Sequence, residues 1–290
     1  MAAVGASPSP ERRAWPWVAF AVAAGAIVTA AVIVRLDLPE AVSGLDIVWA
    51  TAWLAYAAVG AAVAARRPGN PVGPLLLAAG CAVAAGTLLD TWASALLAAT
   101  PSSGLGAFLS DVQGTLFVPG LVCVVPLALL YVPAGSLLGR GWAVPAWGAV
   151  VAGAASVLDV LVPGTVASAW PALYLPCAVA SVGSLGVRWW RDEQEQRRQI
   201  AWLVLGVGAS VAIGLLALAV TLIGGSIPDP VGSILAAAVA VLPPAGIAVA
   251  MLRHACRTGS AGRARPAPTR GCDPSTRPTP ISTSGGCRSG

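Results

Sequence analysis

The chain has 290 residues, of which 57% are hydrophobic and only 10% are charged. Soluble domains carry about a quarter charged residues, so this composition excludes a water-soluble globular protein and predicts an integral membrane protein. The net charge of +5 comes with 17 basic residues, all arginine, scattered between apolar segments. That arrangement is typical of membrane-orientation signals and argues against a nucleic-acid partner.

The chain begins with a short polar segment, residues 1–14, followed by an apolar run. This run is longer than the hydrophobic region of a usual secretory signal, and no soluble domain follows it, so we interpret it as a membrane span. A bilayer core about 30 Å thick needs roughly 20 apolar residues per helix. We therefore predict an all-α polytopic membrane protein with about eight transmembrane helices. The predicted spans are residues 15–34, 47–65, 72–97, 114–132, 143–162, 171–187, 200–223 and 231–251.

The composition changes after His254. Residues 255–290 are rich in Arg, Pro, Gly, Ser and Thr, and Ile281 is the only aliphatic residue there that is larger than alanine. Such a segment has too little apolar surface to form a core. We expect three parts: a disordered cytoplasmic start at 1–14, a transmembrane domain at 15–254 with a cytoplasmic connector at 188–199, and a disordered, low-complexity tail at 255–290.

The positions of the arginines predict the orientation. With the N-terminus inside, the segments that contain Arg66, Arg140 and residues 188–198 are cytoplasmic together with the tail, and Arg35 is the only arginine outside. The absence of lysine and the abundance of Ala, Gly and Pro suggest a GC-rich bacterial coding sequence. We expect a multi-pass protein of the bacterial plasma membrane, partnered by the lipid bilayer, with both termini cytoplasmic.

The polar stretch 188–202 lies between two predicted spans. Its four arginines and three acids are bracketed by tryptophans, which suits a headgroup boundary where arginines reach water. Glu195 follows Arg191 by four residues and precedes Arg198 by three, so the stretch can form a charge-paired helix that continues from one span into the next. Two interpretations stay open: a solvated loop, or a rigid connector that docks a cytoplasmic partner. The candidate coupling residues are Arg188, Arg191, Glu195, Arg197, Arg198, Gln199 and Trp202.

Several carboxylates are predicted on the outer side. Asp90 and Asp159 occur late in their spans, whereas Asp111 and Asp229 are assigned to outer segments. Ionisable groups at the bilayer midplane are costly and usually functional, but these lie near the boundary. One interpretation is a set of carboxylates at the wet interface. The other is an outward-facing sensor of a cation, a cationic compound or pH, formed by Asp90, Asp159 and Asp229 with Arg35 as the counter-charge.

Small residues and prolines predict how the helices pack. Gly206 with Ser210 and Gly214, and Gly80 with Ala84, have the spacing that lets backbones approach closely in lipid. Prolines inside spans are expected to kink them. These prolines are Pro119, Pro126, Pro145 and Pro176.

Motifs for catalysis or metal binding are not found in the sequence. The six cysteines form no CxxC pair and there is a single histidine, which argues against a zinc site and a disulfide framework. The Gly-x-Gly pairs that begin at Gly104 and Gly206 have no strand-turn-helix context. We expect no catalytic residues, no metal and no cofactor.

Three stretches together resemble a known family. RRPGNPVG at Arg66–Gly73 opens a span, YVPAGSL at Tyr131–Leu137 closes one, and Arg188–Leu203 contains RRQIAWL. In this order they resemble the multi-span membrane input region of actinobacterial sensor histidine kinases. The resemblance covers about residue 45 to His254.

The chain departs from the family pattern at several positions. Pro74 stands where tryptophan is usual after the first stretch. In the second stretch, Ala134 and Ser136 replace the polar pair of Phe-Pro-Asp-Gly-Arg-Leu. In the third, Ala201 occupies the position of a lysine.

The resemblance implies a sensory module of a two-component system, with a homodimer and a separate kinase or response regulator as partners. Family members continue into a phosphoacceptor helix and an ATP-binding domain, whereas here the low-complexity tail follows His254. We therefore expect no enzymatic activity, and we hypothesise a truncated or frameshifted kinase gene. The alternative is a transporter or permease, which would call for a midplane charge, a broken-helix pair or an inverted repeat. A third option is a structural membrane protein that only binds partners.

Overall fold

The computed structural model describes residues 10–37, 44–162, 170–191, 194–223 and 228–252. The chain divides into two units, residues 1–254 and 255–290, and all described residues lie in the first. The predicted tail therefore lies outside the described residues. Within the described ranges the regular secondary structure is entirely helical, which confirms the predicted fold class.

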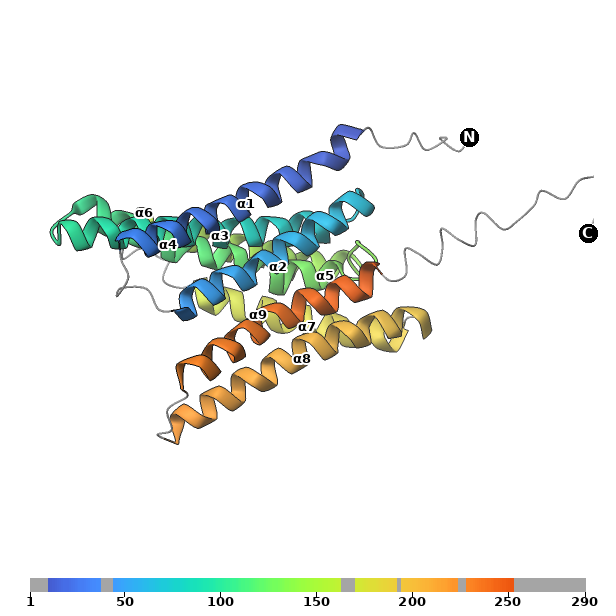
Figure 1. Cartoon of the computed structure of the whole chain (residues 1–290). Helices are drawn as coiled ribbons and strands as arrows, with labels where there is room; N and C mark the ends of the chain where they lie inside the picture. The colour runs from blue at the N-terminus through green and yellow to red at the C-terminus, as the bar shows by residue number, and fades with distance from the viewer. Residues whose placement is uncertain (1–9, 38–43, 163–169, 192–193, 224–227, 253–290) are drawn as a thin grey trace, which may run out of the picture. The chain divides into compact units, whose positions relative to one another are not determined.

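The helices follow the predicted spans closely (Figure 1). Within the described residues, seven segments are long and apolar enough to cross a membrane. The remaining predicted span, 47–65, corresponds to α2, which packs against α1, α3 and α9. The elements are α1 (Pro10–Asp37), α2 (Gly44–Arg66), α3 (Val72–Ala99), α4 (Gly104–Val122), the π-helix η1 (Cys123–Ala128), α5 (Leu129–Tyr131), the 3-10 helix η2 (Arg140–Trp142), α6 (Ala143–Leu161), α7 (Trp170–Arg191), α8 (Gln194–Leu222) and α9 (Asp229–Leu252).

The fourth span begins earlier than predicted. It starts at Gly104 instead of 114, because the Ser103 side chain caps the helix by accepting a hydrogen bond from the Gly106 backbone N–H at 3.2 Å. Asp111, which was assigned to an outer loop, therefore lies on α4. The same span continues through η1 and α5, and Pro126 lies inside the π-helical turn.

Two helix pairs approach through glycine, as predicted. A Cβ added to Gly80 on α3 would lie 2.6 Å from the Cβ of Ala57 on α2, and one added to Gly206 on α8 would lie 2.6 Å from the Leu242 carbonyl oxygen on α9. Only glycine allows these backbones to come so close. The prediction is wrong for Gly214, which is exposed and where an added Cβ would meet nothing within 4 Å.

The other prolines lie within helices that are not interrupted, and the predicted kinks stay a prediction. Pro119 and Pro176 lie inside α4 and α7, which run on through them. Pro145 is the third residue of α6, in the first turn, where its missing N–H would have no partner within the helix.

Large apolar side chains cover the outside of the bundle. Val144, Val179 and Leu215 are each at least 60% exposed. In water such surfaces would drive association, whereas in a bilayer they face hydrocarbon. Their exposure agrees with the membrane location that the composition predicts.

Candidate functional site

The stretches 66–73, 131–137 and 188–203 meet at one end of the bundle, which we call the basic end because Arg66, Arg140 and Arg191 belong to it. In Figure 1 this is the end at which α2, α5 and α9 finish. Their contact is made by a small group of polar atoms. We call this group the junction and define it as Asn70, the carbonyls of Leu130 and Ser136, Gly135 and Arg188.

Arg188 is the central side chain of the junction. It is only 3% exposed, and its Nη2 donates to the carbonyl oxygens of Leu130 at 2.6 Å and Ser136 at 2.7 Å. The carbonyls at a helix C-terminus have no partner within the helix, and guanidinium supplies several donors in one plane. The expectation that the arginines of this stretch reach water is therefore wrong for Arg188, which joins α7 to α5 and to the segment after it.

The segment after α5 is shaped for this contact. Val132 is extended, which is the conformation favoured for a residue before proline, and it ends the helix. The Gly135 backbone N–H then donates to the Tyr131 carbonyl at 2.7 Å, with a φ of 76° that favours glycine. The resulting turn presents the Ser136 carbonyl to Arg188.

Asn70 connects the first stretch to this turn. Its side chain is 9% exposed, and its Oδ1 accepts a hydrogen bond from the Val72 backbone N–H at 2.9 Å, at the start of α3. A Cβ added to Gly135 would lie 3.0 Å from the Asn70 amide carbon. Gly135 therefore meets two requirements: the left-handed backbone and the close approach of Asn70.

Beneath the junction lies the main hydrophobic cluster. It includes Val132 after α5, Leu185 of α7, Ile200 of α8 and Met251 at the end of α9, all buried. The end of the last helix thus packs in the same cluster as the segment that Arg188 holds. A change in the position of α7 or α5 would displace α9 through these contacts, because closely packed side chains transmit displacement.

The connector itself differs from the continuous helix that was considered. α7 ends at Arg191 and α8 begins at Gln194, and the two helices run antiparallel, with residues from Val182 to Trp189 and from Ile200 to Leu205 lining one groove. Arg191 and Glu195 therefore belong to different helices, whereas Glu195 and Arg198 both lie on α8, where their pairing stays a prediction. The Arg197 Nη2 donates to the Trp190 carbonyl at 3.4 Å, which joins the two helix ends.

The remaining coupling candidates are spread around the α8 start. Arg191 and Arg198 are exposed, and Gln199 is half-buried. Trp202 is 41% exposed, and its carbonyl lies at the close crossing with Gly246 of α9. The side chain of Glu195 lies outside the described residues.

The predicted sensing residues are at the other end of their helices. Asp90 is exposed on α3, and Asp159 is half-buried in the last turn of α6; both helices pack on α4. Arg35 and Asp229 belong to α1 and α9, but their side chains lie outside the described residues. Near Asp90 is a groove of about 550 Å³ between α1, α3 and α4, and its lining is apolar. It is lined by Ile33, Leu89, Trp92, Ala95, Leu96, Leu105 and Leu109. A sensing pocket around Asp90 and Asp159 stays a prediction.

Sequence reasoning missed Asn70 and Gly135, and it placed Arg188 in water. A signal for Arg188 was available: Ser181, Ser184 and Arg188 share one face of a helix, and all three are buried. A polar stripe on an otherwise apolar helix indicates an internal contact. Nothing in the local sequence identifies the partners, because Leu130 and Ser136 are more than 50 residues away.

Among the described residues, no three His, Cys, Asp or Glu side chains gather as metal ligands would. In comparisons with known proteins, no family model, no curated protein and no solved structure matches this chain. Composition, helix length and exposed apolar surface nevertheless decide the class. This is a multi-span helical membrane protein.

Proposed function

We propose that this multi-span protein is the membrane-embedded input module of a two-component signalling system, without catalysis of its own. The observation that carries the proposal is the Arg188 contact. It ties α7 to the segment after α5 directly above the cluster that holds the end of α9. An input module needs such a link between its spans and its last helix. The three stretches that form this link are also the ones in which the chain resembles the sensory half of a histidine kinase.

The mechanism is a shift between two packings of the same helices. Both hydrogen bonds of Arg188 depend on the position of α7 relative to α5, so a stimulus that displaces α7 breaks both together. Leu185, one turn before Arg188, contacts the cluster that contains Met251. A stimulus needs only a difference in affinity for the two packings to change their populations.

We place the basic end in the cytoplasm, because arginine-rich segments are retained on that side. Reporter fusions test this orientation. A fluorescent protein fused after Gly139 is expected to fluoresce, and alkaline phosphatase fused after Ser102 is expected to be active. The reverse pattern would place the output end outside the cell and contradict the proposal.

The functional experiment uses the full chain in membrane vesicles with two-component kinase cores that lack a membrane region. We expect the chain to change phosphorylation of the response regulator by at least one core. Arg188→Gln is expected to abolish this change, and Arg66→Gln, at an exposed arginine of the basic end that is not a coupling candidate, is the matched control.

Three outcomes contradict the proposal. Phosphorylation that is the same with and without the chain for every core would remove the input role. Autophosphorylation of the purified chain would show catalysis of its own. Uptake of a solute by proteoliposomes that contain only this chain would favour the transporter alternative instead.

A further inference from the structure

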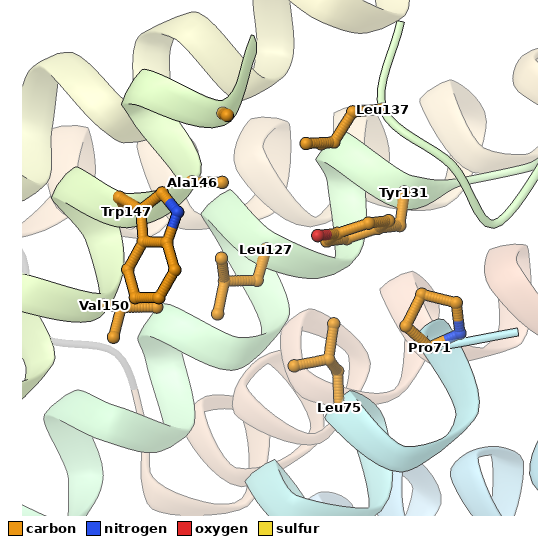
Figure 2. Close-up of a pocket in the computed structure, with 9 residues that line it drawn as sticks. Pro71, Leu75, Leu127, Tyr131, Leu137, Ala146, Trp147 and Val150 are labelled. Carbon is orange, nitrogen blue, oxygen red and sulfur yellow. The ribbon is translucent and has the colours of Figure 1, made fainter. Parts of the chain in front are cut away.

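An apolar groove opens at the basic end between α3, the η1–α5 segment and α6. Its volume is about 320 Å³, which is within the range of small-ligand sites. Figure 2 shows its walls, with the Tyr131 hydroxyl directed toward the middle of the group. The walls used below are Pro71 and Leu75, just before and within α3, Leu127 of η1, Tyr131 of α5, and Trp147 and Val150 of α6.

The groove faces the bilayer. Trp147 is 69% exposed and Val150 is 42% exposed, so the α6 side of the groove is on the outer surface of the bundle. In a membrane protein this surface meets hydrocarbon. A lipid chain can therefore enter sideways without crossing water.

Positive charge lies at the end of the groove that is nearest the basic end. The exposed Arg140 is three residues before Ala143, which lines the groove, and the half-buried Arg67 is four residues before Pro71. Residues 61–75 and 127–150, which contain the whole lining, include no Asp or Glu. The site thus combines an apolar slot with two nearby arginines, and this combination is complementary to a lipid with a negatively charged headgroup.

We propose that this groove binds an acyl chain of an anionic phospholipid, whose phosphate lies near Arg140 and Arg67. The binding site does not depend on the proposed input role. Tyr131 directly follows Leu130, whose carbonyl Arg188 binds, so the bound chain contacts a neighbour of the junction.

The probe is phosphatidylglycerol brominated on its acyl chain, compared with brominated phosphatidylcholine, in nanodiscs that contain the full chain. Bromine quenches nearby tryptophan, and the difference between the wild type and Trp147→Phe isolates the emission of Trp147. We expect phosphatidylglycerol to quench Trp147 at a severalfold lower mole fraction than phosphatidylcholine. Quenching of Trp147 that is equal for the two lipids, or absent with both, would overturn the proposal.

Substitutions of the two arginines test the contribution of the headgroup to binding separately from that of the acyl chain. Each of Arg140→Gln and Arg67→Gln should weaken the preference for phosphatidylglycerol roughly fivefold. A single basic residue near an anionic lipid raises the affinity by about this factor. Arg140→Lys should retain the preference, which shows that the loss is not a failure to fold. A preference unchanged in the double Gln variant would overturn the role of the arginines, and with it the proposal.

A matched pair tests the groove itself. Val150→Phe narrows the slot, whereas Val151→Phe makes the same change one residue further on α6, at an exposed position that does not line it. We expect native mass spectrometry to find less retained phosphatidylglycerol in the Val150 variant only. Equal retention in the two variants would show that the lipid binds elsewhere.

Discussion

The two ends of the bundle differ in how deeply their charged side chains are buried. At the basic end, Arg188 is buried and donates to two carbonyl oxygens. At the other end, Asp90 is exposed, and Asp159 lies half-buried in the last turn of α6. Carbonyls at a helix C-terminus accept hydrogen bonds and carry partial negative charge, so they stabilise a guanidinium and disfavour a carboxylate. The same kind of helix end therefore holds a buried arginine in one place and leaves an aspartate near the surface in another.

Arg188→Leu should have the largest effect, because it leaves a buried carbonyl, that of Leu130, and the partly buried carbonyl of Ser136 without this donor. We expect a loss of about 3 kcal/mol in the free energy of unfolding. The measurement is unfolding in mixed micelles with increasing denaturing detergent. Arg191→Leu, on the exposed side of the same helix, should cost less than about 0.5 kcal/mol. Equal losses for the two variants would mean that the buried contact contributes no stability.

Gly80→Leu tests a contact between α2 and α3 that involves no charge. A Cβ at Gly80 would meet the backbone nitrogen and Cβ of Ala57 at 2.6 Å, so the helices must separate. Overpacking of this kind costs about 2 kcal/mol. The control is Gly25→Leu on α1, where a Cβ meets nothing within 4 Å. Similar unfolding free energies for the two variants would refute the close approach.

Asn70→Ala removes the acceptor of the Val72 N–H at the start of α3. We expect a loss of about 1 kcal/mol, which is typical of a helix-capping side chain. Asn70→Asp retains the acceptor oxygen and should recover most of this stability. If the Asp variant is as unstable as the Ala variant in the same micelle assay, the hydrogen bond is not the reason for the asparagine.

The smallest effects are expected at the other end. Asp90→Asn and Asp159→Asn should each change the free energy of unfolding by less than about 0.5 kcal/mol, because exposed and half-buried side chains are readily replaced. The two variants also test the hypothesis that these carboxylates sense a cation or pH. In the kinase-core assay both variants should alter the response to pH or to a cation. An unchanged output in both would leave the carboxylates as interface residues.

The helices were predictable because hydrophobicity and length are local properties. Runs of about 20 apolar residues identified spans such as 72–97 and 143–162 to within a few residues of α3 and α6. The start of α4 was missed because the helix, capped by Ser103, begins at Gly104, ten residues before the predicted start and in a segment that is less apolar. The candidate site was predicted only in part: Arg188 was named, but it was assigned to water.

The sequence by itself determined that this is a membrane protein and where most of its helices lie. Composition alone makes water an unsuitable solvent for this chain, and helix length follows from the thickness of the bilayer. Only the tertiary structure decided which groups the internal arginine contacts. Arg188 differs from Arg191 because α7 presents it to the carbonyls of Leu130 and Ser136, which are 58 and 52 residues away in the chain. Such partners meet through packing alone, so no local pattern in the sequence encodes them.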